Sequence, residues 1–353
     1  MNLKKYENLK RENKDLINLN PLQTGGKLTG NAKKVLVEFG DGYAVYDLSP
    51  GLELMEVPLI KEFINEALPK FLGADIVRII LGAREGIFNV MHSITKPGDT
   101  ILVDANRHYT TITAAERANL TVVEVPNSGE PEYKINTEDY EYLIKKHKPA
   151  MILLTYPDGN YGNLPDAKKL GEIAERHQVP YLISGAYAVG RMPISMREIG
   201  ADFIIGSSQK SMASSGSIGV LGMDKKWEKI MLRKSKRYPK IEIEFLGSEL
   251  RGTAIATLMA SFPAVAERVN NWGKEVEKVQ WFSKEMEKLG LKQAGDKPHK
   301  HDLLFFKADP FYKISLKHSR GRFFLYHELK KRGITGIKPG LTKHFKISTY
   351  GIP

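Results

Sequence analysis

Short apolar segments alternate with helix-like segments from residue 77 to residue 221, and this alternation restricts the fold more than any other feature of the chain. Most apolar runs are separated by stretches with apolar residues at helical spacing, among them Arg84–Ile94, Thr110–Ala118 and Asp166–His177. Strands that alternate with helices form βαβ units and a mainly parallel sheet covered on both faces. We therefore predict an α/β fold with one large seven-stranded sheet, whose strands are Val77–Ile80, Thr100–Val103, Thr121–Val125, Met151–Thr155, Tyr181–Ile183, Phe203–Ile205 and Ile218–Leu221.

The segments on either side of this sheet predict an arm and a smaller domain. The first twenty residues are mostly polar and predict a helix or an arm, and helical sequence follows from about Asn31 to Phe39. Pro58–Leu72 has the apolar spacing of an amphipathic helix.

After residue 245 the pattern changes and Thr253–Leu289 is predominantly helical. Leu303–Phe306, Phe323–Lys330 and Phe345–Ser348 then indicate a small α+β domain with antiparallel strands. We predict an N-terminal arm over residues 1–30, a large domain over 31–250, and a helical connection with a small C-terminal domain over 251–353.

Length and composition narrow the class of protein. A chain of 353 residues with 42% hydrophobic and 27% charged residues is typical of a soluble protein with two domains or one large domain and an appendage. No apolar stretch approaches the roughly 18 residues that a membrane helix needs, and the polar start is not a secretory signal. We therefore expect a cytoplasmic protein without membrane association. Cysteine is absent, which excludes disulfides, thiolate nucleophiles, Fe–S clusters and zinc–thiolate sites, and no metal site is predicted.

Polar segments that directly follow predicted strands are candidates for a site, because ligands gather at the carboxyl ends of strands in such sheets. Gly82–Gly86 opens a helix and suits a phosphate, although small residues open many helices. Asn106–Tyr109 carries a histidine that either stacks on a flat ring and moves protons or is an ordinary surface residue. Tyr156–Asn163 is a shaped loop that can also be a turn without function.

Lys210 is the candidate amine of the chain. It lies just beyond an apolar strand within Ser207–Ser211, and Ser184–Tyr187 follows the preceding strand. Partial burial there would lower the lysine pKa and allow Schiff-base chemistry, whereas most lysines are solvated surface charges. One organisation accounts for all these places. Fold-type I pyridoxal-phosphate enzymes carry the same features in the same order along the chain. These are a strand-end phosphate turn, a ring-stacking histidine, a loop asparagine, a polar residue facing a ring nitrogen and a late lysine.

The chain resembles the archaeal O-phosphoseryl-tRNA:cysteinyl-tRNA synthases over nearly its whole length. The segments that carry the resemblance are Ile17–Leu28, Gly40–Tyr43, Leu68–Gly73, Gly82–Glu85, His108–Tyr109, Thr155–Asp166, Gly185–Tyr187, Gly190–Pro193, Lys210–Met212, Arg251–Thr253 and Ile337–Thr342. The resemblance implies a fold-type I transferase that binds pyridoxal 5′-phosphate and forms a homodimer. It also implies a further helix after Pro353.

The resemblance assigns roles to individual residues. By that likeness Lys210 holds the cofactor covalently and acts as the catalytic base, with His108 as the ring-stacking residue and second catalytic candidate. The other expected cofactor-binding residues are Ala83, Arg84, Asn160, Ser184, Ser207, Ser208, Gln209 and Thr253. The expected substrate-binding residues are Arg84, Tyr109, Arg251 and Lys346. His108 is a further candidate ligand for the departing phosphate, and Arg251 and Thr253 resemble the segment that reaches the partner's site.

Three positions depart from the family pattern. Ala44–Ser49 stands where the family carries a pair of cysteines thought to hold persulfide sulfur, so a sulfur relay by this chain's own cysteines is excluded. Gln209 replaces a histidine before the lysine, and Ser184 replaces the asparagine that faces the pyridine nitrogen. The resemblance therefore implies retained cofactor binding with sulfur from free sulfide, thiophosphate or a partner's persulfide.

The expected reaction is conversion of O-phosphoseryl-tRNA(Cys) to cysteinyl-tRNA(Cys) by phosphate β-elimination and sulfur addition. The formal net charge of +12 fits a polyanionic partner, and the basic residues gather in Lys225–Lys240 and Lys292–Lys346. Further expected partners are the phosphoseryl-tRNA synthetase and a separate sulfur donor. Two other hypotheses remain open at this point: a divergent pyridoxal-phosphate lyase acting on a small amino acid, and a non-catalytic homologue that binds tRNA or a protein partner.

Overall fold

The computed structural model describes residues 3–20, 27–41, 44–45, 59–246 and 250–350. Parts of two segments that carry the family resemblance, residues 21–26 and 42–43, lie outside the described residues, as does most of the cysteine-free stretch after them. The burial and contacts of the Arg251 side chain are likewise outside what the structure describes.

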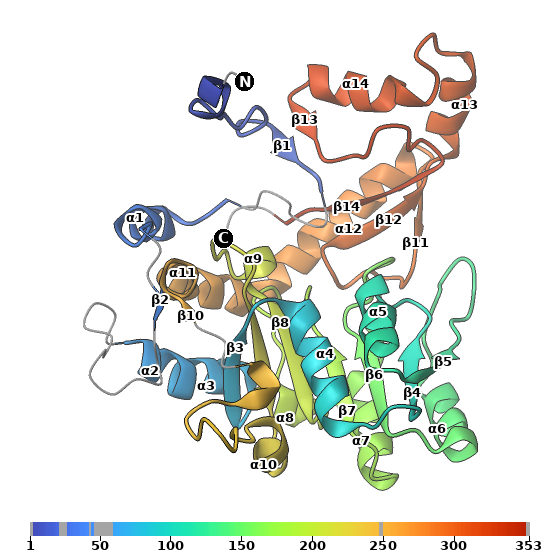
Figure 1. Ribbon diagram of the computed structural model, residues 1–353. Helices are drawn as coiled ribbons and strands as arrows, with labels where there is room; N and C mark the ends of the chain where they lie inside the picture. Colours follow the sequence, from blue (N-terminus) through green and yellow to red (C-terminus); the bar gives the residue numbers. More distant parts are fainter. Residues whose placement is uncertain (1–2, 21–26, 42–43, 46–58, 247–249, 351–353) are drawn as a thin grey trace.

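A seven-stranded sheet forms the centre of the larger part of the chain, with the strand order β3-β9-β8-β7-β6-β4-β5 (Figure 1). Strand β9 runs antiparallel to both its neighbours, and the pairs from β8 to β5 are parallel. The predicted α/β fold with a mainly parallel seven-stranded sheet is therefore confirmed. The strands are β3 (Ile76–Ile80), β4 (Thr100–Asp104), β5 (Thr121–Val125), β6 (Met151–Thr155), β7 (Tyr181–Ser184), β8 (Phe203–Ser207) and β9 (Gly219–Met223).

The sheet is buried on both faces, which explains why its strands read as continuous apolar runs. Every residue of β6 is buried, and successive residues enter different cores: Ile152 and Leu154 pack on one face, Met151 and Leu153 on the other. Helices α4 (Ala83–Ile94) and α5 (Tyr109–Arg117) cover the second face. The first face is covered by α3 (Leu68–Leu72), α6 (Thr137–His147), α7 (Ala167–Arg176) and α11 (Gly252–Asn270).

A three-stranded antiparallel sheet, β11-β12-β14, forms the centre of the C-terminal part. Its strands are Lys292–Ala294, Leu303–Lys307 and His344–Ser348, which confirms the predicted antiparallel strands. The helices α12 (Trp272–Lys288), α13 (Asp309–Lys317) and α14 (Phe324–Lys331) accompany it, with a separate core that includes Val279, Phe306 and Phe345. The division into residues 1–30, 31–250 and 251–353 stays a prediction.

The remaining elements are short, apart from α1 (Gly30–Glu38), which packs against α11. The predicted helix over Pro58–Leu72 is found from Ile60 onward, but five residues in its middle form a π-helical turn. The short helical elements are α2 (Ile60–Glu62), η2 (Phe63–Ala67), α8 (Met196–Ile199), α9 (Ser208–Ser211), η3 (Lys225–Trp227), α10 (Glu228–Met231), η4 (Ile243–Phe245) and η5 (Gly321–Phe323). A two-residue antiparallel pair joins β2 (Ala44–Val45) to β10 (Leu250–Arg251).

The helix predicted in the first twenty residues is wrong. Within residues 3–20, which the structure describes, only η1 (Leu3–Tyr6) is helical, and β1 (Ile17–Asn18) pairs in parallel with β13 (Ile334–Thr335). An isolated polar helix is only marginally stable, so pairing with the small domain decides the conformation of the arm. Gly336, at φ +104°, permits the close approach, because a Cβ there would lie 2.4 Å from the backbone nitrogen of Asn20.

Within the described part of the chain, the structure contains no helix that is both long enough and apolar enough to cross a membrane.

Candidate active site

A cleft of about 830 Å³ opens at the carboxyl ends of β4, β6, β7 and β8, where ligands gather in sheets of this kind. Each strand ends in a residue or loop that lines the cleft. The lining includes His108, Tyr109 and Thr110 after β4, Thr155 in β6, Ser184 in β7 and Ser207 in β8, together with Leu81, Gly82, Ala83 and Arg84 after β3.

The N-terminus of α4 forms one wall of this cleft. Ala83 and Arg84 are its first two residues, and Gly82 before them has φ +131°, a conformation that favours glycine. The backbone N–H of Leu81 donates to the Glu85 carboxylate at 2.6 Å. Unpaired N–H groups and the helix dipole make such a helix end suitable for an anion, and Arg84 adds a cation.

Lys210 lies on α9, directly after β8, and its ammonium group stands 4.4 Å from the centre of the Tyr187 ring. Burial, together with the nearby cations Arg191 and Arg84, lowers the pKa of Lys210 from its ordinary value of 10.5 to about 8. About a tenth of the Lys210 side chains are thus unprotonated amines at pH 7, and about half at pH 8. This is the state that attacks an aldehyde.

We expect the apo protein to capture pyridoxal phosphate faster as the pH rises, with half-maximal rate near pH 8, because only the neutral Lys210 amine reacts. Stopped-flow absorbance across pH 6–10 measures this rate, with Nα-acetyl-lysine amide as the reference amine. A midpoint near the ordinary lysine value would contradict the placement of Lys210.

His108 caps the N-terminus of α5. Its Nδ1 accepts the Thr110 N–H at 3.3 Å and lies 2.8 Å from the Thr110 hydroxyl. Burial lowers the pKa of His108 to about 4, and the surrounding cations Lys210, Arg84 and Lys346 lower it as well. The ring is therefore neutral at pH 7, which suits stacking. A role as a cationic phosphate ligand, considered from the sequence, does not fit this environment.

The loop Tyr156–Asn163 is organised by the buried carboxylate of Asp158. Its oxygens accept the backbone N–H groups of Asn160 and Tyr161 at 2.9 and 2.6 Å and that of Asn163 at 3.1 Å. Asn160 donates from its side chain to the Asn106 carbonyl at 3.3 Å. Lys346, from β14, donates to the Gly159 carbonyl at 3.0 Å, so the small sheet is attached to this rim of the cleft.

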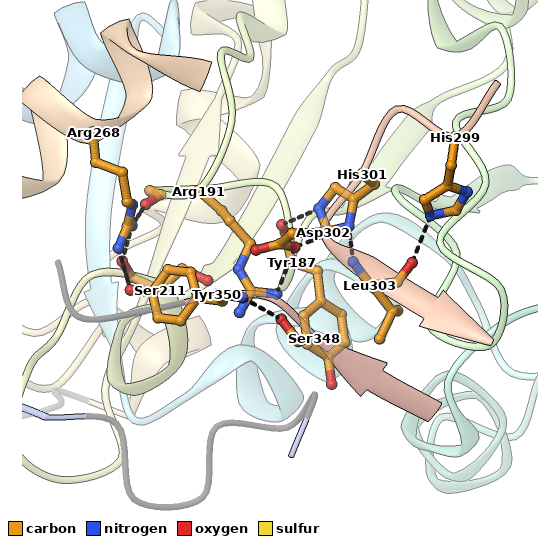
Figure 2. Close-up of polar contacts among 11 residues, drawn as sticks. Tyr187, Arg191, Ser211, Arg268, His299, His301, Asp302, Leu303, Ser348 and Tyr350 are labelled. Atoms are coloured by element: carbon orange, nitrogen blue, oxygen red, sulfur yellow. Dashed lines mark hydrogen bonds and ion pairs between the residues drawn. The ribbon is translucent and has the colours of Figure 1, made fainter. Parts of the chain in front are cut away.

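A buried polar cluster behind Lys210 joins the two parts of the chain (Figure 2). Arg191 is fully buried and its guanidinium lies 3.3 Å from the Asp302 carboxylate, an ion-pair contact without hydrogen-bond alignment. His301 lies 3.1 Å from the Tyr187 carbonyl through Nε2. Because His301 Nδ1 accepts the Leu303 N–H at 3.0 Å, Nε2 carries the proton and donates.

Arg268, on α11, extends this cluster to the segment that carries Lys210. Its guanidinium donates to the Ser211 carbonyl at 2.5 Å and also to the Gly190 carbonyl and the Tyr350 hydroxyl. The Arg191 guanidinium also lies 4.3 Å from the centre of the Tyr350 ring. Among the described residues, Arg191 therefore has the Asp302 carboxylate within ion-pair distance, whereas Arg268 is held by carbonyl and hydroxyl oxygens.

The structure brings together eight of the predicted site residues, which all line the cleft: Ala83, Arg84, His108, Tyr109, Ser184, Ser207, Gln209 and Lys210. Asn160, Ser208, Thr253 and Lys346 are not in the lining. The Thr253 hydroxyl donates to the Phe39 carbonyl, and the Lys346 ammonium is held at the loop rim. For Arg251 the structure describes the backbone but not the side-chain contacts.

Sequence reasoning assigned no role to Tyr187, although it lies under Lys210, nor to the segment Ser214–Ser217 that closes the cleft. Tyr187 lies three residues after the end of β7, at the end of the segment Ser184–Tyr187 that the strand-end rule indicated. The importance of Arg191 had no such signal, because its partner Asp302 is distant in the sequence.

The residues present fit pyridoxal phosphate. The group requires an amine for its aldehyde, an anion site for its phosphate and polar partners for its ring, and the cleft offers Lys210, the α4 N-terminus with Arg84, and several hydroxyls. Around Lys210, the Ser208 and Ser214 hydroxyls and the Gln209 Oε1 are buried without a hydrogen-bond partner among the described residues. Buried polar atoms of this kind usually have partners, so a polar ligand would satisfy them.

Solved structures define the class of this fold. The apo cysteine desulfurase from Thermococcus onnurineus superposes with a TM-score of 0.74 at 15% identity, covering 95% of this chain and 90% of that one. Such low identity shows the fold alone. The large mixed sheet and the small antiparallel sheet are those of a fold-type I pyridoxal-phosphate enzyme.

Closer relatives narrow this class. The O-phospho-L-seryl-tRNA:Cys-tRNA synthase of Methanosarcina mazei is 51% identical, covering 99% of this chain and 92% of that protein. The crystal structure of a SepCysS–SepCysE N-terminal domain complex matches with a TM-score of 0.93 and 47% identity, covering 100% and 95%. The model of the family described as O-phosphoseryl-tRNA(Sec) selenium transferase, SepSecS, matches residues 84–351. The chain belongs to the O-phospho-L-seryl-tRNA:Cys-tRNA synthase family.

Proposed function

We propose that this chain converts O-phosphoseryl-tRNA(Cys) to cysteinyl-tRNA(Cys) with pyridoxal phosphate as its cofactor. The observation that carries the proposal is the position of Lys210, in a cleft beside an anion-binding helix end, in a chain with half its residues identical to those of the named synthases. Hydrosulfide replaces phosphate at Cβ of the seryl group, so the products are cysteinyl-tRNA and inorganic phosphate.

Residues of the cleft would hold the cofactor in distinct ways. Lys210 would bind its aldehyde, Ala83, Arg84, Ser207 and Ser208 its phosphate, and His108 the face of its ring. Ser184 would face the ring nitrogen, Asn160 the 3′-oxygen, and Gln209 would lie beside the lysine. When bound, pyridoxal phosphate withdraws electrons from the substrate's Cα and thereby makes its proton acidic.

Lys210 is the proposed base. Its Nζ would accept the Cα proton, and a pKa near 8 places it close to the operating pH, where general bases are most effective. Arg84 and Arg251 would bind the departing phosphate through their guanidinium forks, with Tyr109 and Lys346 at the rim of the substrate site. His108 is neutral, so we assign it to the cofactor ring and leave the phosphate to the arginines.

The sulfur must come from outside the chain, because none of its 353 residues is cysteine. Free sulfide, thiophosphate, or a persulfide on another protein together with a thiol that reduces it are the proposed donors. We also propose a homodimer in which Arg251 and Thr253 approach the partner's cleft. The phosphoseryl-tRNA synthetase is a further proposed partner, and a cytoplasmic location follows from these partners.

The proposal is tested by supplying the cofactor-loaded protein with O-phosphoseryl-tRNA(Cys) and inorganic sulfide, which bypasses any protein sulfur carrier. We expect release of phosphate and cysteine on the tRNA, and little turnover of free O-phosphoserine under the same conditions. Turnover of the free amino acid alone would identify a small-molecule lyase. Cofactor binding without turnover of either compound would identify a non-catalytic homologue.

A further inference from the structure

We propose that the acceptor arm of the tRNA docks on the small domain, on a basic face formed by Lys313, Lys317, Arg320 and Arg322. This inference rests on the proposed function, which requires a tRNA, and adds the place where its backbone binds. These residues occupy the second half of α13 and the turn that leads through η5 to α14. The three elements pack against one another, so the four side chains belong to one continuous edge of the domain.

The charges of this basic face are not neutralised by the protein. All four side chains are exposed, and among the described residues none has an acidic group within ion-pair distance. Lys313 and Lys317 are four residues apart and so share one side of α13. Lys317 also stabilises the C-terminus of its helix, but Arg320 and Arg322 lie beyond the helix end, so that explanation does not extend to them.

Exposed apolar side chains accompany these cations. Leu316 is 67% exposed and directly precedes Lys317, and Phe323 is 51% exposed and directly follows Arg322. Unpaired cations interleaved with exposed aromatic and aliphatic groups suit a sugar–phosphate backbone and the face of an unstacked base. Because the proposed reaction already requires a tRNA, we assign these groups to RNA and treat an acidic protein surface as the competing outcome of the test.

The other basic segment, Lys225–Lys240, lies at the end of the large sheet that is opposite the cleft. It follows β9, which is antiparallel to β8, so it begins at the edge of the sheet opposite the cleft. Figure 1 shows α10 at that edge and α13 and α14 on the side where the parallel strands end. Four of its cations are already paired: Lys225 with Glu228, Lys226 with Asp202, Arg233 with Glu244 and Lys234 with Glu242.

The basic face is also connected to the cleft by structure. Helix α13 follows β12, whose neighbour β14 carries Lys346, and Lys346 donates to the carbonyl of Gly159, a lining residue of the cleft. In this proposal the acceptor stem crosses this edge, on the side of the sheet where the parallel strands end, and its 3′ end enters the cleft that holds Lys210. Phosphate contacts of this kind position a nucleic acid without reading its sequence.

The test compares two triple variants with the same change in charge. The small-domain variant carries Lys317→Gln, Arg320→Gln and Arg322→Gln, and the control carries Lys229→Gln, Lys236→Gln and Arg237→Gln, which are equally exposed and also lack ion pairs in the described structure. Filter binding of a tRNA(Cys) transcript is measured from 50 to 400 mM KCl. Thermal unfolding and cofactor absorbance show that both variants are folded with an intact cleft.

We expect the small-domain variant to bind tRNA at least about tenfold more weakly at low salt and to lose about two units of slope in the plot of log affinity against log salt. The control should change by less than about twofold. With O-phosphoseryl-tRNA, the small-domain variant should show a raised KM with kcat unchanged at saturation, because docking is separate from the chemistry.

The docking proposal would be overturned if both variants bound tRNA equally weakly, or if the small-domain variant bound tRNA as tightly as the wild type. Wild-type tRNA affinity in a small-domain variant that has instead lost a protein partner would also overturn it. The experiments distinguish a failure of the proposed docking face from a failure of the proposed activity. A wild-type protein that binds tRNA through this face without releasing phosphate refutes only the activity, whereas normal turnover and binding by the small-domain variant refutes only the docking face.

Discussion

Replacing Lys210 with alanine is expected to abolish the visible absorbance of the cofactor-loaded protein and to reduce phosphate release from O-phosphoseryl-tRNA by at least about 10³-fold. The amine at this position is both the proposed covalent attachment and the proposed base, so its removal deletes two functions at once. The side chain projects into the cleft and has no ion-pair partner among the described residues, so the free energy of unfolding should change little.

The variant Lys210→Arg separates charge from covalent chemistry. Its guanidinium keeps a cation near the Tyr187 ring but cannot form the bond to the aldehyde, so it should be as inactive as the alanine variant. Absorbance, phosphate release and thermal unfolding of both variants are the measurements. Retention of the visible band in Lys210→Ala would show that the cofactor is held elsewhere and would refute the proposed site.

Replacing Asp302 with alanine should lower the free energy of unfolding by about 3–5 kcal/mol, the range seen when one partner of a buried ion pair is removed. Asp302 is 2% exposed and is the carboxylate closest to Arg191, which has no exposure at all. Without Asp302, a buried guanidinium that makes no hydrogen bond in the described structure would lose its counter-charge. Urea unfolding at pH 7 measures the loss.

Two variants control this result. Arg191→Met combined with Asp302→Leu removes both charges and should recover most of the lost stability, because apolar residues can replace a buried pair at little cost. Glu285→Ala breaks the more exposed pair with Lys288 and should cost no more than about 1 kcal/mol. A loss of that small size for Asp302→Ala would mean that water or another group compensates Arg191.

The large sheet was predictable because its strands are buried on both faces. Met151–Thr155 is apolar up to its last residue and matched its observed boundaries, and shorter apolar or β-branched runs indicated the antiparallel β12 and β14. Helix α6 was not singled out, because Tyr140 and Ile144 are the main apolar anchors of a polar segment. The helix expected in the first twenty residues was wrong because the conformation of this segment depends on β13, far away in the sequence.

The site was partly predictable for a similar reason. Arg84 and Lys210 directly follow strands, so their meeting at one sheet edge follows from the topology. The charge state of His108 could not be predicted from the sequence, because its low pKa depends on burial and on cations from three other segments. The Arg191–Asp302 contact joins the two parts of the chain, and no local sequence pattern predicts a pair between residues so far apart.

The pairing of β1 with β13 sets an order for folding on the ribosome. More than three hundred residues separate Ile17 from Ile334, so the first strand emerges long before its partner exists. The nascent chain must keep that strand unpaired while the large sheet assembles from its own nearby βαβ units. The first strand can therefore pair only after residues 334–335 have left the ribosome, when the large sheet is already complete in the nascent chain.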